Sequence, residues 1–203
     1  FSDTDYIKSE YKKINNLFLQ GKFNLVIEKT KKIIKKNPNQ IPFYNLLALS
    51  YRETNKILNA EQILNSALKI NPNDQSLLVN LGATYRVLFE FEKSEKCFNK
   101  VLSVNPKNIH ALVNYANLKR ETNKFNESIK LYEAAYKMDD ENPIILINLA
   151  GVYQILGKFE SKNVEKANDH ISIRNKTWID DIIGNQKCSP NDATHAHESG
   201  KEY

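Results

Sequence analysis

Three asparagines recur at an interval of 34 residues and are the first candidates for a chemical role: Asn80, Asn114 and Asn148. An asparagine amide offers both hydrogen-bond donors and an acceptor, so it can bind the N–H and C=O groups of an extended peptide whatever its side chains. Asn117, a few residues after Asn114, is a further candidate of the same kind. This chemistry is that of binding rather than of catalysis.

Three arginines recur at the same interval and accompany the asparagines: Arg52, Arg86 and Arg120. Each hydrogen bond from an asparagine contributes only about 0.5 to 1.5 kcal/mol, so ionic or apolar contacts must add to them for a peptide to bind. We therefore expect weak, micromolar binding that uses both rows. A second interpretation stays open, because duplicated repeats copy their surface residues and a surface arginine is commonly solvated or paired within its helix.

The elements that position these rows are indicated by a helix-breaking motif with the same period. Asn37-Pro38-Asn39, Asn71-Pro72-Asn73 and Asn105-Pro106-Lys107 are spaced by 34 residues, and Asn142-Pro143 lies close to the next expected position. Proline and asparagine stop a helix, so each unit is expected to end at such a motif. A repeat of this length predicts a stack of similar helical units.

Within each unit, apolar residues fall at helical spacing in two blocks separated by a short turn. A small residue recurs in the first block as Ala48, Gly82, Ala116 and Ala150, where two antiparallel helices can approach closely. This pattern resembles the tetratricopeptide repeat (TPR). The resemblance implies an all-α fold, a right-handed superhelical solenoid of antiparallel helix pairs, with the first helix of each pair on the concave surface.

The strength of the repeat pattern divides the chain into four parts. Residues 1–40 match only in part and are interpreted as a degenerate first repeat. The repeats proper occupy 41–157, as 41–74, 75–108, 109–142 and the first helix of a fourth unit over 143–157. Residues 158–183 are expected to form closing helices, and residues 184–203 are polar, without periodicity, and expected to be disordered.

A closer resemblance is carried by Asn114-Tyr115-Ala116-Asn117-Leu118-Lys119-Arg120-Glu121 and by Asn148-Leu149-Ala150. These segments are similar to the repeats of O-linked N-acetylglucosamine transferases, whose superhelix carries an asparagine ladder that contacts the substrate backbone. The resemblance assigns Asn80, Asn114 and Asn148 to that ladder. It departs at Leu46, where the ladder position is apolar and Asn45 lies one residue early. The catalytic domain of that family is absent from this sequence.

The composition limits the other classes of function. The net charge of +5 comes largely from one lysine cluster before Pro38, and no nucleic-acid-binding motif accompanies it, so no nucleic-acid partner is expected. No apolar run approaches the roughly 18 residues of a membrane-spanning helix. Cys97 and Cys188 match no disulfide or metal-ligand spacing, so we expect no metal, no cofactor and a cytoplasmic location. Because the chain begins at Phe1, an upstream targeting segment is left open.

The sequence thus predicts a protein-interaction scaffold, not an enzyme, that binds a protein or extended peptide in its concave groove. The alternative is the non-catalytic repeat region of a larger glycosyltransferase or sulfotransferase, because similar repeats precede such catalytic domains and residues 167–173 resemble the join to a sulfotransferase domain. In that case the partner is a transferase domain in the same or another chain.

Overall fold

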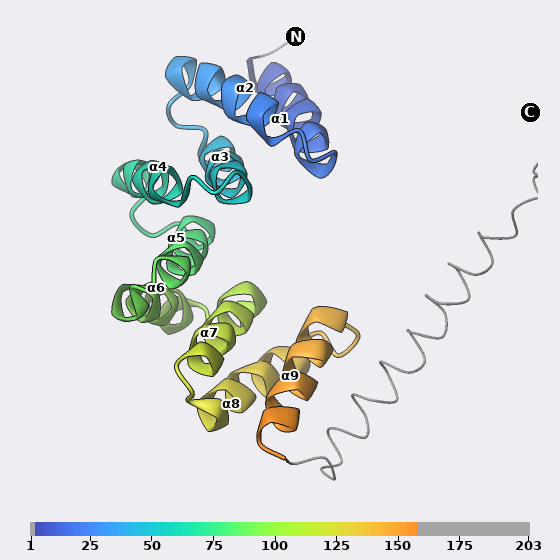
Figure 1. Cartoon of the computed structure of the whole chain (residues 1–203). Helices are drawn as coiled ribbons and strands as arrows, with labels where there is room; N and C mark the ends of the chain where they lie inside the picture. The colour runs from blue at the N-terminus through green and yellow to red at the C-terminus, as the bar shows by residue number, and fades with distance from the viewer. Residues whose placement is uncertain (1–2, 158–203) are drawn as a thin grey trace, which may run out of the picture.

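The computed structural model describes residues 3–157, and within this range the chain forms helices joined by short turns (Figure 1). No strand occurs in that part of the chain. The helices, in chain order, are α1 (Asp3–Leu19), α2 (Phe23–Lys36), α3 (Ile41–Glu53), α4 (Ile57–Ile70), α5 (Gln75–Val87), α6 (Phe91–Val104), α7 (Ile109–Glu121), α8 (Phe125–Tyr136) and α9 (Pro143–Ile155). The predicted all-α fold is confirmed.

The first helices of the later units begin at short polar side chains that cap them. Asp74 accepts a hydrogen bond from the Leu77 backbone N–H at 2.9 Å, and Asn108 accepts one from Ala111 at 3.0 Å. A capping side chain satisfies one of the backbone N–H groups that have no partner inside the helix. The polar residues around the second and third proline motifs therefore end one unit and also start the next, whereas Gln40 before α3 makes no side-chain cap.

In the unit 75–108 the two helices are in close contact at the recurring small residue, Gly82. A Cβ atom added to Gly82 would lie only 2.7 Å from Cε1 of Phe98, which is fully buried on α6. The hydroxyl of Ser94 donates to the Gly82 carbonyl oxygen at 2.7 Å, and Ser128 donates to the Ala116 carbonyl at 2.8 Å. The small residue and the serine together hold the two antiparallel helices in contact.

The stack is curved because its first helices touch one another and its second helices do not. Contacts join α1 to α3, α3 to α5, α5 to α7 and α7 to α9, whereas within the described range α4, α6 and α8 make none with each other. Figure 1 shows the result as an arc, with α3, α5, α7 and α9 along its inner side and α4, α6 and α8 along its outer side. The inner helices carry the candidate binding residues.

One side of α9 differs from the same side of the earlier first helices. Ala48 and Ala116 are fully buried beneath the second helix of their units, whereas Ala150 at the same repeat position is partly exposed. Ile144, Ile147 and Ile155 on α9 are more than half exposed, and of these Ile147 differs from its counterpart on α7, Val113, which is half-buried. The segments expected to close the stack, residues 158–183, and the expected tail, residues 184–203, lie outside the described residues.

None of the helices among residues 3–157 is both long and apolar enough to cross a membrane.

Candidate peptide-binding groove

The first two units of the groove are joined by a chain of hydrogen bonds between polar side chains. Asn80 on α5 donates from Nδ2 to Oδ1 of Asn45 on α3 at 2.7 Å. Asn45 in turn donates to the hydroxyl of Ser76 at 2.7 Å, and Ser76 donates to Asp74 at 2.6 Å. These bonds hold the Asn80 amide in one orientation across the boundary between two units. An amide held in this way loses little side-chain entropy when it binds a ligand.

A hollow of about 380 Å³ lies on this face between α5 and α7. Its wall includes Asn80 and Asn114 from the predicted row. The side-chain carbonyl oxygen of Gln75 accepts hydrogen bonds from both Asn105 and Asn108 at 3.0 Å, which fixes the rim where α7 begins. The residues that line the hollow are Gln75, Ser76, Val79, Asn80, Asn108, His110 and Asn114.

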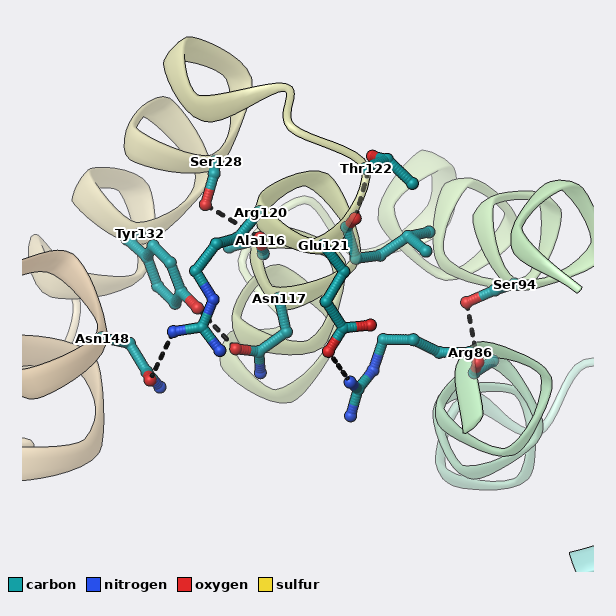
Figure 2. A network of polar contacts seen from close by, with 12 residues as sticks. Arg86, Ser94, Ala116, Asn117, Arg120, Glu121, Thr122, Ser128, Tyr132 and Asn148 are labelled. Carbon is teal, nitrogen blue, oxygen red and sulfur yellow. Dashed lines mark hydrogen bonds and ion pairs between the residues drawn. The ribbon is translucent and has the colours of Figure 1, made fainter. Parts of the chain in front are cut away.

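The other three predicted asparagines have different surroundings. Asn114 donates to the backbone carbonyl of His110 one turn earlier at 2.8 Å, and Asn148 on α9 accepts a hydrogen bond from Arg120 at 3.3 Å. Asn117 accepts a hydrogen bond from the Tyr132 hydroxyl at 2.6 Å, which ties α7 to α8 (Figure 2). Asn117 is thus already used to join the two helices of its own unit.

The arginines connect successive first helices, with a different partner in each unit. Arg86 on α5 forms an ion pair with Glu121 on α7, and Arg120 on α7 reaches Asn148 on α9 (Figure 2). The Arg52 guanidinium on α3 has no hydrogen-bond or ion-pair partner among residues 3–157. The arginine row thus contains two internally bonded members and one without a partner among residues 3–157.

A separate charged cluster lies away from the groove, between α7 and the second helices α6 and α8. The Lys119 ammonium is 2.8 Å from a carboxylate oxygen of Glu95 and 2.8 Å from one of Glu127, and its side chain is only 5% exposed. Burial alone would lower the pKa of Lys119, but hydrogen bonds to Glu127, Glu95 and Tyr115 outweigh it and raise the pKa above its usual value of 10.5. This cluster is a structural junction between units.

The described residues offer little reactive chemistry. They contain no group of three or more His, Cys, Asp or Glu side chains that could hold a metal ion. Burial raises the pKa of the Cys97 thiol to about 11, so it is almost entirely protonated and a poor nucleophile near neutral pH. What the groove presents is a set of amides, hydroxyls and guanidinium groups, which suit hydrogen bonding to a peptide.

Two groove residues, Asn45 and Ser76, were not among the predicted binding residues, because a strict 34-residue period excludes them. Asn45 lies one residue before the ladder position, which Leu46 occupies, and Leu46 is buried against α1 and α2. The Asn45 amide nevertheless reaches Asn80. A search that accepted a polar residue at either of two adjacent helix positions would have identified Asn45.

A curved all-α stack of antiparallel helix pairs defines a helical solenoid protein. Residues 41–74, 75–108 and 109–142 each match the model of the tetratricopeptide repeat, and together they make up half of the chain. The chain therefore belongs to the tetratricopeptide repeat family.

Solved structures share this fold at low sequence identity. A thermophilic TPR protein of Thermus thermophilus, TTC0263, superposes with a TM-score of 0.73 at 13% identity, over 87% of this chain and 93% of its own. A tetratricopeptide repeat protein from Parabacteroides merdae gives a TM-score of 0.65 at 22% identity, over 84% and 63%. MamA gives 0.66 at 16% identity, over 80% and 96%. Among curated proteins, no sequence matches.

Proposed function

We propose that this protein is a protein-interaction scaffold that holds an extended segment of a partner protein along the concave face of α3, α5, α7 and α9. The observation that carries the proposal is the hollow between α5 and α7, whose wall includes the amides of Asn80 and Asn114. Within residues 3–157 no group donates to the amide oxygen of either residue, so both oxygens are free to accept from a peptide N–H. Concave faces are the usual binding surfaces of solenoid proteins.

The partner expected from this face is a polypeptide in extended form rather than a helix or a small molecule. Amides repeated along successive helices match the regular N–H and C=O groups of an extended backbone. Contacts from the arginines add to those of the three asparagines. A transferase domain in the same or another chain is a separate candidate partner, which would dock on the repeats as a folded domain and not as an extended segment. We place the interaction in the cytoplasm, on the absence of a disulfide spacing in the sequence.

The test compares two sets of asparagine substitutions on opposite faces of the stack. One variant combines Asn80→Ala, Asn114→Ala and Asn148→Ala on the concave face. The matched control combines Asn59→Ala, Asn99→Ala and Asn126→Ala, three exposed residues on α4, α6 and α8. Peptides from a proteolysed cell lysate are passed over each immobilised protein, and the retained peptides are identified and their dissociation constants measured.

Loss of three hydrogen bonds should weaken binding by at least about tenfold in the concave variant and leave the control unchanged. Helical circular dichroism establishes that both variants are folded. Equal retention by both variants would place the binding site elsewhere and remove the support for this groove.

A further inference from the structure

Arg52 lacks the acidic neighbour that neutralises the next arginine in its row. Arg86 pairs with Glu121 of the following unit. The residue 34 positions before Glu121 is Val87, so the corresponding place beside Arg52 holds an apolar side chain that is 38% exposed. The Arg52 guanidinium therefore has no ion-pair partner among residues 3–157.

The surroundings of Arg52 make this unpaired charge unfavourable in the free protein. Burial lowers the pKa of Arg52, and the positive charge of nearby Arg86 lowers it further. A guanidinium stays protonated in proteins, so the positive charge remains at the site. The negative charge of Glu53, the next residue, raises the pKa of Arg52, but Glu53 forms no ion pair with Arg52 within the described range.

Arg86 also retains an unused hydrogen-bond donor. Its Nη1 group binds Glu121, but its Nε atom is buried and has no acceptor among the described residues. A buried donor without an acceptor is destabilising, and it is uncommon in folded proteins. Two neighbouring arginines on α3 and α5 thus offer one free guanidinium and one free N–H.

We propose that Arg52 and Arg86 form a carboxylate-binding site in the groove, which takes an aspartate or glutamate side chain of the bound partner segment. A carboxylate accepts several hydrogen bonds at once and would compensate the charge that Val87 leaves unpaired. The site belongs to the same two helices that carry Asn45 and Asn80, so one extended segment can contact both. This inference rests on the groove function proposed above and adds the chemistry of its partner.

The probe is a phage-displayed library of short random peptides fused through their C-termini, so that side chains supply every carboxylate. The library is selected on the full chain and on two variants, Arg52→Gln and Val87→Glu. The first variant removes the free cation, and the second places a carboxylate where Glu121 lies in the next unit. A selected peptide is then synthesised with blocked ends, both as selected and with its acidic residue changed to the corresponding amide.

Peptides selected on the unchanged protein are expected to share one acidic position. Changing that acid to its amide should weaken binding about tenfold to a hundredfold, as expected for a charge-assisted hydrogen-bonded pair. With the Arg52→Gln and Val87→Glu proteins, changing the peptide's acid to its amide should alter the dissociation constant less than about threefold. The reason is that neither variant can form the ion pair between Arg52 and the peptide. Thermal unfolding followed by circular dichroism establishes that the variants are folded.

The outcomes separate this inference from the groove function. Peptides that bind the groove without a shared acidic position, or that lose equal affinity in all three proteins, overturn the carboxylate site and leave the scaffold function standing. A second library with free C-termini identifies a terminal carboxylate as the ligand if only its members bind, and that result overturns the side-chain assignment. A folded protein that retains no peptide from either library overturns both proposals.

Discussion

At the residue scale, Phe89 has a backbone conformation for which the other units carry glycine or asparagine at the same turn position. Its φ angle is +59°, and the same turn position holds Asn55, Asn123, Gly21 and Gly157, all with positive φ. The left-handed conformation brings Cβ close to the following carbonyl oxygen, and only glycine and, to a lesser degree, asparagine adopt it readily. Phe89 is also 80% exposed, so packing offsets little of this strain.

We predict that Phe89→Asn raises the free energy of unfolding by about 0.5 to 1 kcal/mol, because asparagine tolerates the left-handed conformation better. The edge contact of Phe89 with Phe91, at 6.0 Å between ring centroids, is lost and limits the gain. Urea denaturation measures the change, with Val104→Asn as the control because Val104 is 74% exposed but helical. A gain in the control as large as that in Phe89→Asn would show that surface polarity, not backbone strain, is the cause.

The buried cluster around Lys119 predicts a pH dependence of stability. Burial raises the pKa of Glu95, but hydrogen bonds from Lys119 and Tyr115 outweigh it and leave the pKa below the usual value of 4.5. The hydrogen bond from Lys119 likewise lowers the pKa of Glu127. Because the folded-state values are depressed, this stabilisation is present above the unfolded-state pKa and is lost as the pH falls through the folded-state values.

We therefore expect the stability of the unchanged protein to fall as the pH drops below about 4.5, and to fall less in Lys119→Met. Methionine removes the Lys119 hydrogen bonds that depress both carboxyl pKa values and leaves the one from Tyr115 to Glu95. Urea denaturation at a series of pH values gives the two slopes, and Lys130→Met, a change at an exposed lysine of α8, serves as the control. Parallel slopes for Lys119→Met and the unchanged protein would contradict this account.

At the element scale, the helix pairs depend on a small residue at each crossing, and Gly82 shows the requirement most clearly. Glycine inside a helix is ordinarily less stable than alanine by roughly 0.5 to 1 kcal/mol. At Gly82, however, an added methyl group would lie 2.7 Å from the fully buried ring of Phe98, whereas at Gly151 on α9 it would meet nothing within 4 Å. The same substitution should therefore have opposite effects at the two sites.

Gly82→Ala should lower the free energy of unfolding by about 1 to 3 kcal/mol through overpacking, while Gly151→Ala should raise it by roughly 0.5 kcal/mol. Thermal or urea denaturation of both variants measures the difference. Adding Phe98→Leu to Gly82→Ala should recover part of the loss, because it removes the ring that the methyl group meets. Stabilisation by both single substitutions would mean that the α5–α6 crossing tolerates a larger residue.

The helical elements were predictable from the sequence because their signals are local. The proline motifs, the small residue at Gly82 and the apolar spacing each act within one unit, and they indicated the all-α repeat fold correctly. The groove was predictable only in part, since the side-chain contacts that join its successive first helices span 28 to 35 positions. Two examples are the pairing of Arg86 with Glu121 and that of Arg120 with Asn148. Each depends on how far a side chain extends across a unit boundary, and the 34-residue period does not indicate that reach.

At the scale of the whole molecule, the stack has an uncovered side at α9. Three isoleucines there are more than half exposed, and the turn at Gly157 has the same left-handed geometry that precedes the second helix in earlier units. An apolar face of this kind is favourable only when another element covers it. The sequence expectation for residues 158–183 as closing helices supplies such an element and remains a prediction.

We predict that the full chain protects the α9 amides from hydrogen exchange more strongly than a chain ending at residue 157. The reason is that a covering element lowers the population of locally opened states of the terminal helix. Exchange in α5, near the middle of the stack, should be similar in both proteins. Equal exchange in α9 as well would show that residues after 157 do not cover this helix.

The most direct test of the central claim is to locate the bound partner by photo-cross-linking. A benzoylphenylalanine replaces His110, an exposed residue at the hollow of the groove, or Asn99, an exposed residue on the outer helix α6. The groove account predicts that a retained peptide becomes cross-linked at position 110 and not at position 99. Cross-linking at position 99 alone would place the partner on the outer face and contradict the account.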